Sequence, residues 1–225
     1  TGGYSVTSMA QVVSAELTAQ GISNPVLVGH SLGAKVAVRL ASGMMQAERV
    51  VTVDMDPYFD VSTIPEDSPL EHHIDTLITG SDRFEALALA IGRNLPFVNP
   101  LALATILPAL AEATARGDRV LPRVALDPEI KTLLRQRETP RTAELLSTIG
   151  VPVHVVRGAY SGILSPETTA QIAREVNAFA GAETVTQAGH AIPFENPQGL
   201  AMAIASILAR VARNTENSAA DPAVT

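Results

Sequence analysis

The sequence of 225 residues contains no cysteine, which excludes a disulfide framework, a thiolate metal site and a thiol nucleophile. No apolar run reaches the roughly 18 residues that a membrane span needs, because proline and asparagine interrupt the nearest candidate, residues 86–110. Basic residues are few and form no run: 16 Lys and Arg stand against 23 Asp and Glu, for a net charge of −7. We therefore expect neither a nucleic-acid nor a membrane partner. We expect no metal or cofactor, and without a recognisable signal peptide we expect a cytoplasmic location.

What is present is a globular composition, with 46% hydrophobic and 17% charged residues. The most informative segment is Gly29-His30-Ser31-Leu32-Gly33, between the apolar run 26–28 and the helix-prone residues 34–40. This G-x-S-x-G pattern is typical of a nucleophile elbow, in which a buried strand turns sharply into a helix. Glycines on both sides of Ser31 would permit the turn and leave the hydroxyl uncrowded. The N–H of Leu32 would face an oxyanion, and His30 would be structural or line the substrate pocket.

Apolar runs predict buried parallel strands covered on both faces, with helices between them. Strands are predicted at 26–28, 50–53, 153–156 and 184–187. Four helices are predicted, beginning at Ser8, Thr139-Pro140, Ser165-Pro166 and Gln198. The first has an apolar face made of Met9, Val12, Val13 and Leu17. The third has Ile172, Val176 and Phe179 aligned and ends at Gly181. The sequence thus predicts an α/β fold with a parallel sheet and helices on both faces.

Between residues 58 and 138 the strand pattern stops and prolines separate helical segments, among them an apolar stretch at 101–115. Such a long insertion is usually functional, and we expect a helical cap over the carboxyl ends of the strands. The predicted organisation is therefore a core with the elbow at 1–57, a cap at 58–138, a second core part at 139–212, and a disordered tail at 213–225.

The elbow, the run 50–53 ending in Asp54, the segment 153–158 and the late Ala188-Gly189-His190 follow the order of the α/β-hydrolase family, which the sequence resembles over residues 5–212. The resemblance implies a serine nucleophile, Ser31, and a histidine base, His190. The other histidines are weaker candidates. His154 lies inside a strand, and His72 and His73 lie in the cap, where two ligands are too few for a metal site.

The acid that orients His190 is less clear from the sequence. Most of the family carries it in a G-x-x-D-like turn after the strand equivalent to 153–156, but here the turn reads Gly158-Ala159-Tyr160-Ser161-Gly162. The sequence is similar to a branch of small esterases whose acid follows the preceding strand, which implies Asp54. Asp56 is the alternative, and Asp54 could also be a structural carboxylate at the strand end.

The resemblance also implies about four strands before the elbow, and a second oxyanion N–H from a loop between them. Without them the run 26–28 would be an apolar edge strand, so we expect a homodimer or a complementing N-terminal segment.

These features predict a serine hydrolase that cleaves small esters, lactones or thioesters. The apolar cap implies that the acyl or alcohol part of the substrate is uncharged and partly hydrophobic. Perhydrolysis and C–C bond hydrolysis use the same triad and stay open. The alternative is a weakly active or inactive hydrolase fold that binds a ligand or regulates.

Overall fold

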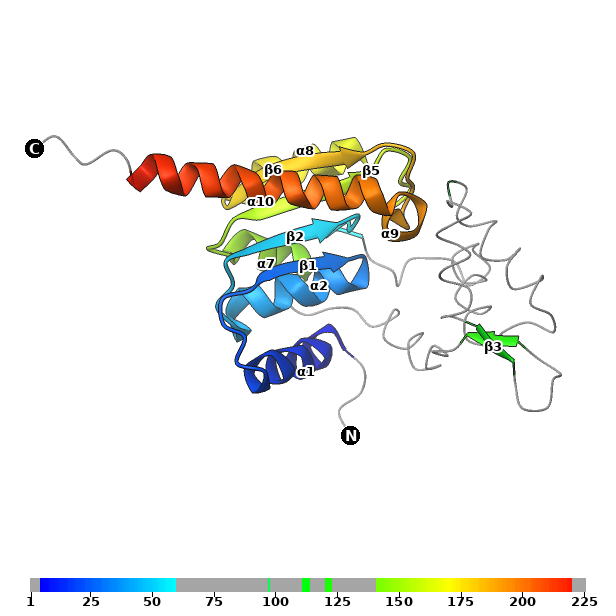
Figure 1. The fold of residues 1–225 in the computed structure, drawn as a ribbon, viewed down its shortest axis with the longest axis horizontal. Coiled ribbons are helices and arrows are strands. Elements are labelled where there is room, and N and C mark those ends of the chain that lie inside the picture. Colours follow the sequence, from blue (N-terminus) through cyan, green and yellow to red (C-terminus); the bar gives the residue numbers. More distant parts are fainter. Residues whose placement is uncertain (1–4, 60–96, 98–110, 114–119, 123–140, 220–225) are drawn as a thin grey trace, which may run out of the picture.

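The computed structural model describes residues 5–59, 97, 111–113, 120–122 and 141–219. Their main feature is a parallel sheet in the order β1-β2-β5-β6 (Figure 1), and the predicted parallel α/β architecture is confirmed. The strands are β1 (Val26–His30), β2 (Arg49–Val53), β5 (Val153–Gly158) and β6 (Phe179–Val185). Because each neighbouring pair is parallel, the carboxyl ends of all the strands lie at one edge.

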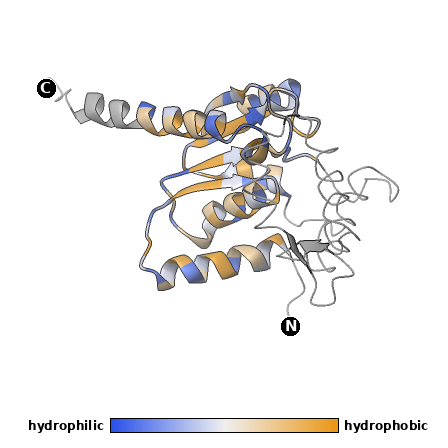
Figure 2. Cartoon of the chain, turned by 45° about the vertical axis from the view of Figure 1, so that its right-hand side comes forward, coloured by the Kyte–Doolittle hydropathy of each residue, from blue (hydrophilic) through white to orange (hydrophobic). Residues whose placement is uncertain are grey.

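Helices cover both faces of the sheet. One face packs against α2 (Leu32–Arg39), α7 (Thr142–Thr148) and α8 (Pro166–Glu175), and α1 (Val6–Ala19) packs on α2. The other face packs against α10 (Pro197–Ala219) and the short α9 (Ile192–Glu195). Side chains alternate between the faces, so the neighbours Val50 and Val51 of β2 belong to different cores. Figure 2 shows the strands mainly in hydrophobic colours.

The first helix begins earlier than predicted. Ser5, not Ser8, is its N-cap: the Ser5 hydroxyl accepts the N–H of Ser8, and the Ser8 hydroxyl accepts the N–H of Ser5. Val6 and Ala10 face the core, whereas Val12 is 70% exposed. The predicted apolar face is therefore wrong in part: Met9 and Leu17 are half-buried, but Val12 and Val13 are exposed, and Val6 and the small Ala10 make the close contacts with the core. Helix α2 leads at its carboxyl end into the π-helical turn η1 (Leu40–Met44), where Gly43 has a φ of 135°.

Three boundaries in the second half also differ from the prediction. Helix α7 begins at Thr142, with Arg141 as N-cap in place of Thr139. Helix α8 is capped by Ser165 as expected, but it ends at Glu175, so Phe179 and Gly181 belong to β6. Helix α10 continues to Ala219, beyond the expected start of a disordered tail at residue 213. Within the part of the chain that the structure describes, no helix is long and apolar enough to cross a membrane.

Most of the predicted cap, residues 58–138, lies outside the described residues, as do His72 and His73. Two described segments form an antiparallel pair, β3 (Ala111–Ala113) and β4 (Val120–Pro122). The predicted helix at 101–115 is therefore wrong at its end, where the turn formers Gly117-Asp118 between the two strands favour a hairpin. Phe97 stacks on Tyr160, which follows β5, with ring centroids 4.7 Å apart.

His154 is a buried histidine of β5, 7% exposed, and its burial lowers its pKa below the ordinary 6.5, with Arg49 and Arg210 adding to the effect. The unfolded chain therefore binds more protons here as the pH falls below about 6.5, and the free energy of unfolding should decrease. We expect urea unfolding at pH 5.5 to need less denaturant than at pH 7.5, and His154→Gln to reduce this difference. An equal difference in the variant would contradict the assignment to His154.

Candidate active site

The elbow places Ser31 between β1 and α2 in a strained backbone conformation, with φ 52° and ψ −119°. Its N–H donates to the carbonyl of Val53 at 3.0 Å, which ties the turn to the end of β2. A Cβ added at Gly29 would lie 2.2 Å from the carbonyl oxygen of Gly33, so position 29 requires glycine. A Cβ added at Gly33 would meet nothing within 4 Å of the described atoms, so the expected need for a second glycine is not seen there.

Three side chains from separate parts of the chain meet at the carboxyl edge of the sheet. The His190 Nε2 atom lies 3.0 Å from Ser31 Oγ, and the His190 Nδ1 atom lies 2.8 Å from Asp54 Oδ2. Asp54 directly follows β2 and is fully buried. Because an ionised carboxylate can only accept, Nδ1 carries the proton and Nε2 is left to accept the Ser31 hydroxyl. The arrangement is that of a nucleophile, a base and an orienting acid.

Asp54 is also held from the turn after β5. Its Oδ1 atom accepts the Gly158 N–H at 2.8 Å, and Oδ2 accepts the Ser161 hydroxyl at 2.5 Å. Asp56, the alternative acid, accepts the Tyr58 N–H at 2.8 Å and the Thr168 hydroxyl at 3.5 Å. The structure thus brings Asp54, and not Asp56, against His190.

His30 lies beside His190, with ring centroids 5.0 Å apart, and its Nε2 atom is 2.7 Å from the His190 carbonyl oxygen. Since a carbonyl only accepts, Nε2 of His30 carries a proton and donates it. Burial lowers the pKa of His30, so its ring is neutral at neutral pH. His30 therefore supports the backbone that carries the base, while its contact with substrate stays a prediction.

Leu32 is the first residue of α2, so its N–H has no carbonyl partner within the helix. Leu32 also directly follows Ser31, and a backbone N–H at that position can stabilise an oxyanion. Among the residues whose positions are described, no cluster of His, Asp or Glu could hold a metal ion.

Sequence reasoning missed two supporting side chains. The carboxylate of Glu195 is buried, and its Oε2 atom accepts the N–H of Gly189 at 2.7 Å, beside the base. Ser161 reaches Asp54 from the turn that lacks the usual carboxylate. Ser161 stands at the fourth position of the turn that begins at Gly158, where most of the family carries Asp. This position could have indicated that its side chain lies near the triad.

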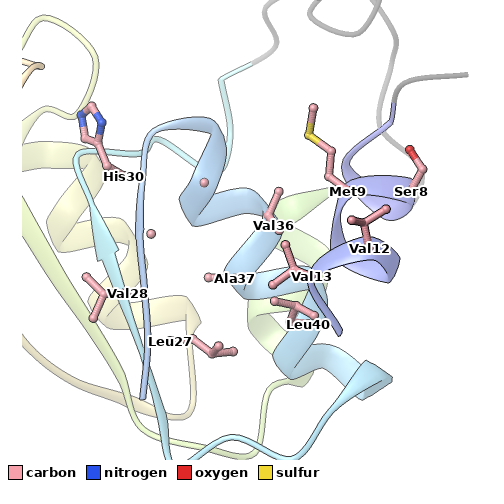
Figure 3. A pocket seen from close by; sticks show the side chains of 12 residues that line it. Ser8, Met9, Val12, Val13, Leu27, Val28, His30, Val36, Ala37 and Leu40 are labelled. Carbon is pink, nitrogen blue, oxygen red and sulfur yellow. The ribbon is translucent and has the colours of Figure 1, made fainter. Parts of the chain in front are cut away.

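An open apolar groove of about 790 Å³ lies between α1, β1 and α2, next to the elbow. Figure 3 shows Val13 of α1 beside Val36 of α2 and Leu40 of η1, with the His30 ring away from them. Val28 of β1 also lines the groove and is 47% exposed, although it belongs to an apolar strand. Within the described residues β1 pairs with β2 on one side only.

The close approach of Gly158 to the His190 loop predicts a large effect of adding one methyl group. A Cβ at Gly158 would lie 2.0 Å from the carbonyl oxygen of Gly189 and 2.7 Å from that of Ala188. We expect Gly158→Ala to destabilise the fold by about 1–3 kcal/mol and to displace His190. Gly162→Ala, where the added atom meets nothing within 4 Å, is the matched control. Equal thermal midpoints and ester hydrolysis rates for the two variants would contradict this packing.

Comparison with known proteins agrees with this geometry. The sequence model described as the alpha/beta hydrolase family matches residues 2–203. The structure is similar to E-2-(acetamidomethylene)succinate hydrolase, with 21% identity and a TM-score of 0.72, over 92% of this chain and 75% of that one. It is also similar to an esterase of Mycobacterium tuberculosis, with 20% identity and a TM-score of 0.67, over 92% and 68%. A third similar structure is a thermophilic esterase of Thermogutta terrifontis, with 20% identity and a TM-score of 0.64, over 93% and 74%.

No curated protein sequence matches this one. At these identities the solved structures support the fold alone, whereas the family model covers most of the sequence, including the elbow and the His190 loop. The chain therefore belongs to the alpha/beta hydrolase family.

Proposed function

We propose that this hydrolase cleaves a small ester, lactone or thioester through an acyl-enzyme on Ser31. The observation that carries the proposal is the continuous hydrogen-bond chain from Ser31 through His190 to Asp54, at 3.0 and 2.8 Å. The strained conformation of Ser31 supports it, because such strain is found where a nucleophile must be presented at a sharp turn.

In the first half of the reaction, Nε2 of His190 takes the hydroxyl proton as Ser31 Oγ attacks the acyl carbon. The Leu32 N–H stabilises the negative charge that develops on the acyl oxygen. Asp54 holds the Nδ1–H tautomer and stabilises the imidazolium that forms. His30 adds no positive charge beside that imidazolium, because its lowered pKa keeps it neutral.

In the second half, the imidazolium of His190 protonates the leaving alcohol or thiol, and the acyl group stays on Ser31. A water molecule then gives its proton to Nε2 and attacks the acyl carbon. Collapse of the second tetrahedral intermediate releases the acid and returns the proton to Ser31.

Esters are the substrate class favoured here because two similar structures are described as esterases. The rival hypothesis is a ligand-binding protein on an inactive hydrolase fold, and the lack of an acid in the turn after β5 favours it. The bond between Asp54 and His190 favours an enzyme instead, because it supplies the acid from another strand.

The test is hydrolysis of p-nitrophenyl acetate and butyrate by the wild type and by Ser31→Ala. We expect measurable turnover by the wild type and only background turnover by the variant. Ser42→Ala is a matched control, because the Ser42 hydroxyl bonds the carbonyl of Arg39 and not the triad. Equal rates for wild type and Ser31→Ala would overturn the proposal.

A further inference from the structure

The turn after β5 contributes a side chain to the triad although it lacks a carboxylate. Ser161 Oγ lies 2.5 Å from Asp54 Oδ2, the same oxygen that accepts Nδ1 of His190. Two backbone groups point at Ser161 Oγ as well: the N–H of Ile163 at 3.0 Å and the N–H of Leu164 at 3.1 Å. Hydrogen bonds of Ser161 Oγ therefore connect the backbone of this turn to the carboxylate of Asp54.

The direction of these bonds follows from the chemistry of a hydroxyl, which has one proton and two lone pairs. The two N–H groups are donors and occupy the acceptor capacity of Ser161 Oγ. The single proton of Ser161 is therefore left for Asp54, which as a carboxylate can only accept. The result is a charge-assisted O–H···O⁻ bond, one of the stronger kinds in proteins.

The backbone of Asp54 is unusual as well. Its φ of 49° lies in the left-handed region, which Asp adopts more often than most residues with a side chain but which is uncommon. The Gly158 N–H holds one carboxylate oxygen and the Ser161 hydroxyl holds the other, and together they determine the plane of the carboxylate. That plane sets where Oδ2 meets Nδ1 of His190.

We infer that Ser161 is a positioning residue, which orients Asp54 through its hydroxyl and so maintains the tautomer of His190. The inference rests on the proposed function for its kinetic consequence, but the hydrogen-bond chain itself can be observed without turnover. Loss of one hydrogen bond to a charged group should lower kcat about 10- to 100-fold with little change in KM.

The experiment compares Ser161→Ala, Ser161→Thr and Ser165→Ala in p-nitrophenyl butyrate hydrolysis and in the proton NMR spectrum of His190. Ser165→Ala is the matched control, because Ser165 lies in the same loop but its hydroxyl caps α8 and does not contact the triad. We expect Ser161→Ala to lose the stated factor in kcat and to shift the Nδ1–H resonance. Ser161→Thr, which keeps the hydroxyl, should recover most of the rate, and Ser165→Ala should leave both readouts unchanged.

Unchanged kcat and an unchanged Nδ1–H resonance in Ser161→Ala would overturn the inference. If the wild type hydrolyses no ester, the proposed function fails, and the resonance still decides the role of Ser161. If Ser161→Ala does not fold, Ser161→Gly, which also lacks the hydroxyl, provides the test, and an unchanged Nδ1–H resonance in that variant would overturn the inference.

Discussion

Replacing Asp54 with asparagine is expected to lower kcat by up to about 10⁴-fold while KM changes little. An asparagine has one oxygen and one NH₂ group, whereas both oxygens of Asp54 accept hydrogen bonds. If the NH₂ takes the place of Oδ2, it faces Nδ1 of His190 and favours the wrong tautomer. If it takes the place of Oδ1, it opposes the N–H of Gly158. Steady-state kinetics on a p-nitrophenyl ester measures the loss.

Asp56→Asn is the matched control for this prediction. Asp56 lies two residues further on and bonds Tyr58 and Thr168 instead of His190, so its replacement should change kcat far less. In the Asp54→Asn background, Ser161→Asp should recover part of the rate, because it supplies a carboxylate from the turn that adjoins His190. Wild-type kcat in Asp54→Asn, with Ser31→Ala inactive, would show that another group orients His190.

The second large effect concerns the oxyanion. Alpha/beta hydrolases use two backbone donors, one after the nucleophile and one from the loop that follows the third strand. Among the described residues Leu32 is placed to be the first donor in the proposed mechanism, and the strand that leads to the elbow, β1, is at the edge of the described sheet. Loss of one donor typically lowers kcat by about 10²–10³. With Leu32 as the donor among the described residues, we therefore expect turnover to be slower by this factor than with both donors in place.

A segment that supplies the second donor should raise kcat by the same factor. The outer edge of β1, with exposed Val28 and the apolar groove beside it, is where an added strand would bury hydrophobic surface. The measurement adds, in cis or as a separate chain, the segment of a structurally similar hydrolase that carries the second donor. The Ser31→Ala protein with the same segment is the control for background rates. No gain in kcat from a segment that binds would mean that another group already serves as the second donor.

The two central strands of the described sheet could be predicted from sequence because they are buried on both faces and form continuous apolar runs. All residues of β2 and β5 are buried, and the predicted runs 50–53 and 153–156 lie inside them. Strand β6 was placed too late because it lies at the edge of the described sheet, where most of its residues are partly or fully exposed. Its apolar Phe179 instead extended the helical pattern of α8.

The candidate site could be predicted in part. Ser31 and His190 occupy local patterns, so sequence order was enough to pair them. The choice of Asp54 over Asp56 depended on a left-handed backbone conformation that turns the Asp54 side chain toward His190, and no local pattern encodes this. Ser161 and Glu195 act through contacts with residues brought close by the fold or by a loop, which a periodicity argument cannot reveal.

The most direct test of the proposed catalytic triad is the reaction of the native protein with a fluorophosphonate, followed by peptide mass spectrometry. The reagent phosphonylates a serine only when a neighbouring base activates it, so we expect one adduct, on Ser31. Heat denaturation before labelling should abolish the adduct, and Asp54→Asn should slow its formation. A native protein that forms no adduct, or forms it equally well after denaturation, would contradict the claim that Ser31, His190 and Asp54 act as a catalytic triad.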